Sequence, residues 1–255
     1  MKAASLPSSL PRRAFELDPT RAWEIVRAVR GDAQPRDKSQ FCGEALPPKG
    51  EGKVRFVCIS DTHSHESKKM SRPTALESIP PGDVLVHCGD FSNTGKRAEI
   101  AAFANWFGKL PHRRKIVIAG NHDLTLDPSS YAETSARFGH DSQGDPLRTC
   151  EEALSIIRTI PSCEYLADEG TEVDGIQIWG SPWQPEFCGW AFNLPRGELI
   201  RQKWRAIPTG VDVLLTHGPP LGHGDLCTSG LRAGCIDLLD EVQSRVSLAQ
   251  EIKDP

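Results

Sequence analysis

Short apolar runs recur along the chain, and each one ends in a polar segment. Four of them span residues 54–60, 84–88, 115–119 and 211–215, and a fifth at 172–180 carries Val173, Ile176 and Ile178. Apolar runs of this length, bounded by polar residues and glycines, are typical of β-strands. We therefore predict a strand at each of these five places.

Between the predicted strands lie stretches with helical periodicity. Residues 96–110 carry Ile100, Phe103, Ala104 and Phe107, whose spacing would bring all four to one face of a helix. Further helices are predicted at 151–160, from the end of the segment 193–196 to residue 207, and at 231–246. Strands that alternate with helices predict an α/β fold.

The amino-terminal part of the chain differs in composition from the rest. Residues 1–52 mix proline, serine and charged residues, with one short helical or extended patch at 14–29, and Pro-Pro-Lys-Gly stands at 47–50. This composition is typical of a flexible leader and linker. We expect one domain at 53–246 and a polar tail at 247–255.

Length, charge and cysteine content narrow the functional classes. The 255 residues suffice for one large domain with a buried core. The net charge of −4 gives no reason to expect binding to nucleic-acid backbones or anionic membranes, and no apolar run reaches the roughly 18 residues of a membrane span. The eight cysteines form no C-x-x-C pair, which favours reduced thiols in a cytoplasmic protein.

Polar side chains with metal-binding chemistry follow four of the predicted strands directly. The segments are Asp61-Thr62-His63, Gly89-Asp90, Gly120-Asn121-His122-Asp123 and Thr216-His217-Gly218. Strand ends in an α/β sheet face a crevice, and Asp, Asn and His are hard or borderline metal ligands. One such residue after a strand is typical of a turn or a helix cap. Four such segments in this order indicate a metal site.

These segments resemble the motifs of the calcineurin-like metallophosphoesterase superfamily, which run D-x-H, G-D, G-N-H-[DE] and a later histidine. The stretches 55–64, 115–122, 180–185 and 216–222 are similar to the branch of metallophosphoesterase domain-containing proteins, the brain protein 239 type. The resemblance covers roughly residues 18–246. It implies a four-layer sandwich in which helices flank two mixed β-sheets, and a hydrolase that acts on phosphodiester or nucleotide-type substrates.

The resemblance also implies a binuclear site with two divalent metal ions (Mn, Fe or Zn) and a metal-bound hydroxide. Asp90 would bridge the two ions. Asp61 and His63 stand at i and i+2, so in an extended strand they would face the same side and bind one ion. Asn121 and His217 would bind the second ion.

Residues outside the ligand set have other expected roles. By the resemblance, His122 lies over the substrate and acts in catalysis, and Asp123 holds its ring. His87 lies within a strand and is expected in the core or behind the ligands. His223, Trp183 and Arg196 are candidates for contact with the substrate, although loop exposure, core packing and a solvated surface explain them as well.

One motif of the superfamily is absent. No Gly-His-x-His follows His217, and residues 247–255 contain no histidine. We therefore expect the final strands to be missing and each ion to lack a nitrogen ligand. Two functions stay open at this point: an active phosphoesterase, or a truncated, catalytically impaired pseudoenzyme that binds metal or nucleotide. A single-metal or purely structural domain is the third alternative.

Overall fold

The computed structural model describes residues 18–30, 48–64, 79–140 and 149–244. The helices are α2 Pro19–Arg30, α3 Arg97–Lys109, α4 Tyr131–Arg137, α5 Cys150–Ile157, α6 Glu198–Arg205 and α7 Ile236–Ser244, with a 3-10 turn η3 at Leu124–Leu126. The strands are β1 Phe56–Ile59, β2 Val84–Cys88, β3 Arg114–Ile118, β4 Cys163–Tyr165, β5 Glu169–Val173, β6 Ile176–Ser181, β7 Gln184–Pro185, β8 Asn193–Leu194 and β9 Val213–Thr216. The predicted α/β fold is confirmed.

The strands form two main sheets and one short pair. The first sheet has the order β1-β2-β3-β4, and all its neighbours are parallel. The second sheet has the order β5-β6-β9 and is mixed, because β5 and β6 are antiparallel whereas β6 and β9 are parallel. Strands β7 and β8 form the short parallel pair. Parallel neighbours place their carboxyl ends along one edge, where the polar segments follow.

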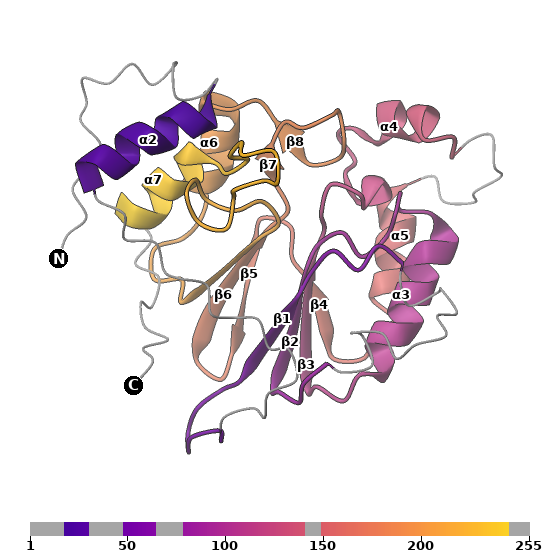
Figure 1. Cartoon of the computed structure of the whole chain (residues 1–255). Coiled ribbons are helices and arrows are strands. Elements are labelled where there is room, and N and C mark those ends of the chain that lie inside the picture. Colours follow the sequence, from indigo (N-terminus) through magenta and orange to yellow (C-terminus); the bar gives the residue numbers. More distant parts are fainter. Residues whose placement is uncertain (1–17, 31–47, 65–78, 141–148, 245–255) are drawn as a thin grey trace.

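The alternation of side chains along the strands produces the predicted four layers. On β2, Leu85 packs in the cluster that includes residues of α3 and α5, whereas Val84 and Val86 pack against Ile178 and Leu215 of the second sheet. Successive residues of a strand point to opposite faces, so the first sheet is covered on both sides. Figure 1 shows the two sheets side by side, with α3 and α5 outside the first sheet.

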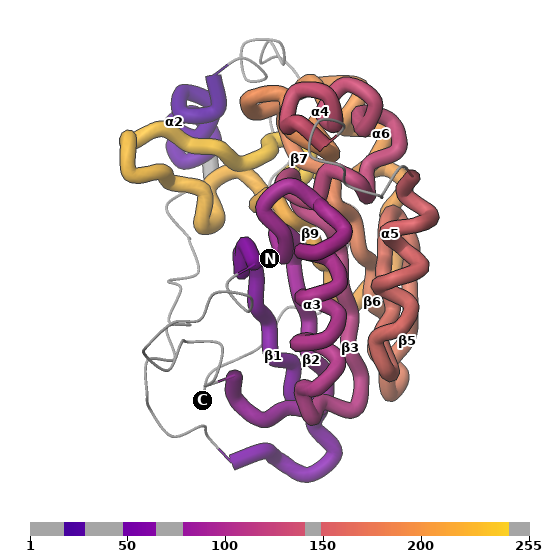
Figure 2. The backbone as a smooth tube through the Cα atoms, turned by 90° about the vertical axis from the view of Figure 1, so that its right-hand side faces the viewer, coloured from indigo at the N-terminus to yellow at the C-terminus, as the bar shows by residue number. Residues whose placement is uncertain are grey.

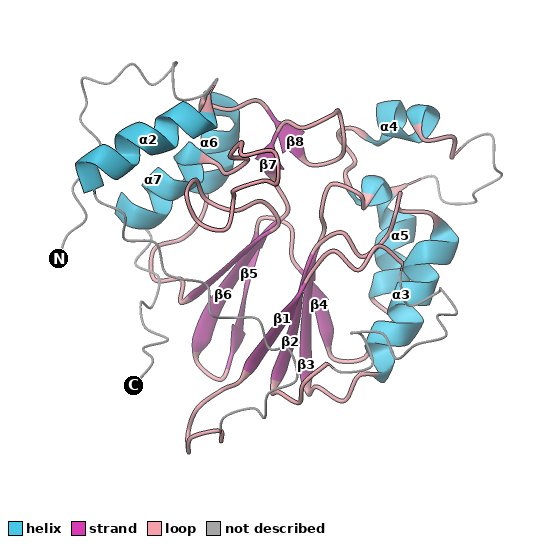
Figure 3. Ribbon diagram, in the orientation of Figure 1, coloured by secondary structure: helices cyan, strands magenta, loops and turns pink. Residues whose placement is uncertain are grey.

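Helix α3 matches the helix predicted at 96–110. Its four buried residues are Ile100, Phe103, Ala104 and Phe107, the set that periodicity assigned to one face. Figure 2 shows α3 and α5 from their outer side, lying against the first sheet. On the other side of the molecule, Trp204 of α6 and Leu238 of α7 pack with Trp179 and Leu214 of the second sheet. Figure 3 shows α3 and α5 beside the first sheet, and α6 and α7 near the upper end of the second sheet.

The single strand predicted at 172–180 is wrong. The segment contains a hairpin, because the chain turns at Asp174 and Gly175 between β5 and β6. Both turn residues have positive φ, 53° and 81°, which is the conformation of a type I′ turn. Asp-Gly between two apolar stretches is a strong hairpin signal, and it outweighs the continuous apolar pattern.

The separation of residues 1–52 from the core is wrong for the part that the structure describes. Helix α2 packs on the domain through Ala22, Trp23 and Val26, which share a buried cluster with residues of α7 and the loop before it. Gly222 is required beneath Trp23, because a Cβ at Gly222 would lie 2.0 Å from that ring. Residues 1–17 and 31–47 lie outside the described residues.

Helix α7 begins at Ile236, five residues later than the start predicted at 231. The preceding residues instead pair with the loop after β9, through the bridges Leu226–Arg232 and Pro220–Cys235. The predicted tail at 247–255 lies outside the described residues. No helix in the described part of the chain is long and apolar enough to cross a membrane.

Trp23→Ala is expected to destabilise the domain. Trp23 is buried against Gly222, and its ring also carries the guanidinium of Arg232 at 4.8 Å. Loss of a buried tryptophan typically lowers the free energy of unfolding by about 3–5 kcal/mol. Thermal melts should therefore show a lower melting temperature than in Glu24→Ala, which changes an exposed residue of the same helix. Equal melting temperatures in the two variants would contradict a stabilising role for α2.

Candidate metal centre

Four polar segments meet where β1, β2, β3 and β9 end. The carbonyl oxygen of Cys88, at the end of β2, lies 2.8 Å from Nδ1 of His217, which follows β9. Glycines allow this close approach. A Cβ on Gly89 would lie 2.7 Å from Nδ1 of His217, and one on Gly120 would lie 2.3 Å from Oδ1 of Asp90. Only residues without a side chain fit at these two positions.

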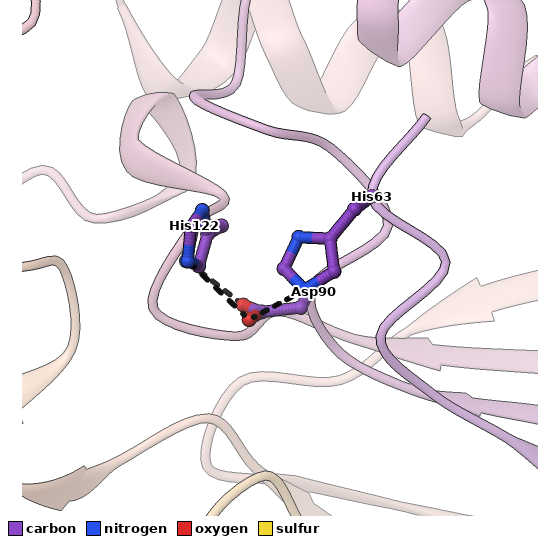
Figure 4. Close-up of side chains that lie close together, drawn as sticks. All are labelled: His63, Asp90 and His122. Carbon is purple, nitrogen blue, oxygen red and sulfur yellow. Dashed lines mark hydrogen bonds and ion pairs between the residues drawn. The ribbon is translucent and has the colours of Figure 1, made fainter. Parts of the chain in front are cut away.

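Asp90 is the centre of the cluster. Its side chain is almost fully buried, and its backbone has φ 57°, a conformation that strains a non-glycine residue. Oδ1 lies 3.4 Å from Nε2 of His217, whereas Oδ2 lies 3.7 Å from Nε2 of His63 and 4.0 Å from Nε2 of His122. Figure 4 shows His63 and His122 turned toward this carboxylate from two loops. Each carboxylate oxygen therefore faces different nitrogens.

The surroundings of His217 fit a bound cation. Its Nδ1 carries the proton, because the neighbouring atom is the carbonyl oxygen of Cys88, which can only accept. Nε2 then presents a lone pair to Oδ1 of Asn121 at 3.1 Å and to Oδ1 of Asp90 at 3.4 Å. Three electron-rich atoms that face one another repel unless a positive charge lies between them. Their chemistry suits a divalent metal ion.

Asp61 and His63 approach each other, but not through the predicted extended backbone. Both residues have positive φ, 56° and 44°, so the loop turns sharply here. Nε2 of His63 lies 4.0 Å from Oδ1 of Asp61 and 3.7 Å from Oδ2 of Asp90. The Asp61 side chain is about half exposed, so it borders the open side of the site. Both side chains are in reach of one ion beside Asp90.

Two groups of candidate ligands share Asp90. One is His63, Asp90 and His122, and the other is Asp61, Asp90 and His217. Within each group the ligand atoms lie within 4.8 Å of one another. The amide oxygen of Asn121 adds to the second group through its contact with His217. Both groups are drawn from the part of the chain that the structure describes.

Comparisons of this sequence with known proteins agree with a metal site at this position. The sequence model of calcineurin-like phosphoesterases matches residues 54–243. Metallophosphoesterase domain-containing protein 1 of Homo sapiens is 41% identical over 237 residues, which cover 91% of this chain and 69% of that protein. Two UPF0046 proteins of Caenorhabditis elegans are 38% and 43% identical, over 90% and 77% of this chain and 56% and 66% of theirs. This chain belongs to the calcineurin-like phosphoesterase family.

The family resemblance assigned His122 to catalysis. In this phosphoesterase-family chain, Nδ1 of His122 lies 2.7 Å from the carbonyl oxygen of Asn93, which accepts a hydrogen bond from the ring. The ring packs against Trp190, with centroids 4.0 Å apart, and meets the edge of His63 at 4.6 Å. These contacts leave Nε2 directed toward Asp90, where it could face a substrate or an ion.

The expectation that Asp123 holds the His122 ring is wrong. The Asp123 carboxylate is fully buried and accepts bonds from the amides of Asp90, Ser92 and Gly120 and from the Ser92 hydroxyl. Burial and, next, the Asp90 charge raise the pKa of Asp123 to about 7, although the bonds from Ser92 and Gly120 oppose this. Asp123 therefore fixes the loops that carry Asp90 and His122, whereas a backbone carbonyl orients the His122 ring.

The three expected substrate contacts are used elsewhere or lie outside both ligand groups. Trp183 donates from its indole nitrogen to Asp168 and lies under the ammonium group of Lys203. Arg196 donates to the carbonyl oxygens of Ala233 and Gly234. His223 is half-buried, burial lowers its pKa, and it belongs to neither ligand group.

Sequence reasoning missed the partners that orient the site. Asn93 acts through its carbonyl oxygen, which every residue possesses, so no motif could identify it. Ser92 holds Asp123, and its position two residues after Asp90 is the only available signal. Trp190 lies in a sequence segment that also contains Trp183 and Phe192, but its contact with His122 depends on tertiary structure. The loop that carries it is held by the amide of Ala191, which donates to the carbonyl oxygen of Asn121.

Proposed function

We propose that this chain hydrolyses phosphodiesters, including nucleotide-type diesters, at two divalent metal ions bridged by Asp90. The observation that carries the proposal is the position of Asp90, whose two carboxylate oxygens face the side chains of different histidines. A bridging carboxylate must reach two ions at once, and this arrangement suits that role. The family membership supports the phosphoester chemistry.

The ligands divide into two sets on either side of Asp90. Asp61 and His63, whose ligand atoms lie 4.0 Å apart, would hold one ion, and Asn121 and His217 would hold the other. Asp61 also lies in one candidate group with His217, so its carboxylate borders both positions. Such ions neutralise the negative charge of a phosphoester and lower the pKa of water. Mixed oxygen and nitrogen ligands suit Mn, Fe or Zn, and the carboxylates favour Mn in an assay.

His122 is suited to act on the substrate. Its Nδ1–H donates a hydrogen bond to the carbonyl oxygen of Asn93. A second proton, on Nε2, would therefore make the ring cationic. That form would stabilise negative charge on the phosphoester and supply a proton to the departing oxygen. Trp190 and Asn93 keep the ring in one orientation for this transfer.

The charge of the site favours a diester over a monoester. A phosphomonoester carries nearly two negative charges at neutral pH, whereas a diester carries one. Arg196, the arginine that was a candidate for a phosphate contact, is bonded to backbone carbonyls. A substrate with the lower charge therefore suits this site better.

We also propose a cytoplasmic location, which the seven free cysteines among the described residues support.

Hydrolysis assays with controlled metal content test the proposal. The protein is stripped with a chelator, supplied with Mn²⁺, Zn²⁺ or Fe²⁺, and offered bis(4-nitrophenyl) phosphate and 4-nitrophenyl phosphate. We expect turnover of the diester that requires added metal and exceeds that of the monoester. Faster turnover of the monoester would contradict the substrate class. Metal binding without any turnover would favour the alternative, a catalytically impaired protein that binds metal or nucleotide.

A further inference from the structure

Thr62 lies between the two candidate ligands Asp61 and His63, and its side chain points the other way. Asp61 is exposed and His63 partly so, whereas Thr62 is buried. The Thr62 hydroxyl lies 3.0 Å from Nε2 of His87, at hydrogen-bond distance. His87 belongs to β2, three residues before Asp90. This bond therefore joins the Asp61–His63 loop to the strand that carries the central carboxylate.

The surroundings of His87 are otherwise apolar. The ring is fully buried and meets Phe91, Phe103 and Phe107 edge to face, at centroid distances of 5.9, 5.3 and 6.1 Å. Its other nitrogen, Nδ1, has no hydrogen-bond partner among the described residues. An apolar side chain would fill such a pocket without the cost of burying a polar ring. The hydrogen bond to Thr62 is what the imidazole adds at this position.

His87 remains neutral at the pH of the cytoplasm. Burial, followed by the nearby histidines His217 and His63, lowers the pKa of His87 to about 3. A neutral imidazole has one N–H and one lone pair, and the Thr62 hydroxyl can complement either. The bond between them therefore does not depend on protonation near neutral pH.

The Asp61–His63 loop has a conformation that needs such an anchor. Asp61, His63 and Ser64 all have positive φ, 56°, 44° and 56°, although none of them is glycine. Strained residues of this kind persist only where the surrounding structure holds them. The amides of Asp61 and His63 donate to the carbonyl oxygens of Gly89 and Asp90, so the backbone is held to the loop after β2. The Thr62–His87 bond is the side-chain counterpart of these contacts.

We infer that His87 is a positioning residue for the metal centre, which orients Asp61 and His63 through the hydroxyl of Thr62. The inference rests on the proposed metal site, because its consequence is the affinity of that site for an ion. His87 itself is a ligand in neither candidate group. It acts from behind the ligands, as partners of ligating residues do in other metal sites.

Paired substitutions separate the hydrogen bond from packing. Thr62→Val removes the hydroxyl at nearly constant shape, and Thr62→Ser keeps the hydroxyl. His87→Phe keeps an aromatic ring in the pocket, and His87→Gln keeps a polar group that can reach Thr62. Calorimetric titration with Mn²⁺ should show affinity weaker by about 10–100-fold in Thr62→Val and His87→Phe, the range for loss of such partners. The Mn²⁺ affinity of Thr62→Ser and His87→Gln should be closer to that of the wild type.

The double variant Thr62→Val/His87→Phe should bind Mn²⁺ no more weakly than the weaker single variant, because both substitutions break the same bond. Additive losses would overturn the inference. So would unchanged Mn²⁺ affinity in Thr62→Val together with a lower melting temperature, since that result would assign the bond to stability alone.

Amide hydrogen exchange without metal separates this inference from the proposed function. Exchange at Asp61 and His63 should be faster in Thr62→Val than in Thr62→Ser, because the loop loses its anchor. This result supports positioning even if no phosphodiester is turned over. Equal exchange in the two variants would overturn positioning even if the wild type is an active, metal-dependent enzyme.

Discussion

Asp90→Asn is expected to abolish metal-dependent hydrolysis and to remove most of the bound metal. The substitution leaves a single carbonyl oxygen where two carboxylate oxygens face His217 on one side and His63 and His122 on the other. Loss of an outer partner of a ligand already costs about 10–100-fold in metal affinity or activity, and loss of the shared ligand should cost at least that much. Metal analysis of the purified protein and phosphodiester turnover measure the two effects.

The metal-free Asp90→Asn protein should nevertheless be as stable as the wild type. Asp90 and Asp123 are both buried, and the Asp90 charge raises the pKa of Asp123. An asparagine removes that repulsion, and its amide group can donate to Nε2 of His63 or His217. Thermal melts in chelator should therefore show no loss of stability, whereas the increase in melting temperature caused by Mn²⁺ should disappear.

Asp174→Asn is the matched control for Asp90→Asn. It makes the same chemical change on the exposed hairpin turn, where asparagine also tolerates the positive φ of 53°. Metal content and turnover of Asp174→Asn should equal those of the wild type.

If Asp90→Asn retained full metal occupancy and turnover, Asp90 would not be a bridging ligand.

The strands and the ligands could be predicted because both depend on local sequence. Apolar runs identified β1, β2, β3 and β9. The bounds of β2 are those predicted, and the bounds of the other three strands shifted by one or two residues. Parallel strands present their carboxyl ends at one edge, so the segments after these strands had to meet. The structure accordingly brings Asp61, His63, Asp90, Asn121 and His217 into one cluster.

The partners behind the ligands could not be predicted because they depend on tertiary contacts. Asp123 follows His122 directly, so a bond between the two side chains was a natural expectation. The turn at 120–123 instead directs the carboxylate inward, to the amides of Asp90 and Ser92. The docking of α2 is a similar case, since Trp23 finds its place only where Gly222 leaves room in a loop about 200 residues away. The local sequence therefore indicates which residues can bind metal or pack in the core, whereas the tertiary fold determines which residues they contact.

His122→Ala tests whether this histidine acts in catalysis or binds metal. Nε2 lies 4.0 Å from Oδ2 of Asp90, so geometry alone allows either role. Asn121 already supplies the ligand from this loop, through its amide oxygen beside His217. We therefore expect turnover of the diester to fall by about 10²–10⁴-fold, the usual effect of losing an acid–base group, while metal content is retained.

The choice of substrate sharpens the test of His122. A proton donor matters most when the leaving group is a poor one, so the loss should be greater for an alkyl diester than for a 4-nitrophenyl diester. If His122 were a ligand, the substitution would lower the turnover of both diesters and the metal content together. His122→Asn provides the matched variant, because its amide can bond to the carbonyl oxygen of Asn93 but cannot supply a proton at neutral pH. Turnover in His122→Asn close to that of His122→Ala, with both ions present, would assign His122 to proton transfer. Recovery of activity in His122→Asn would instead show that a neutral polar group suffices at this position.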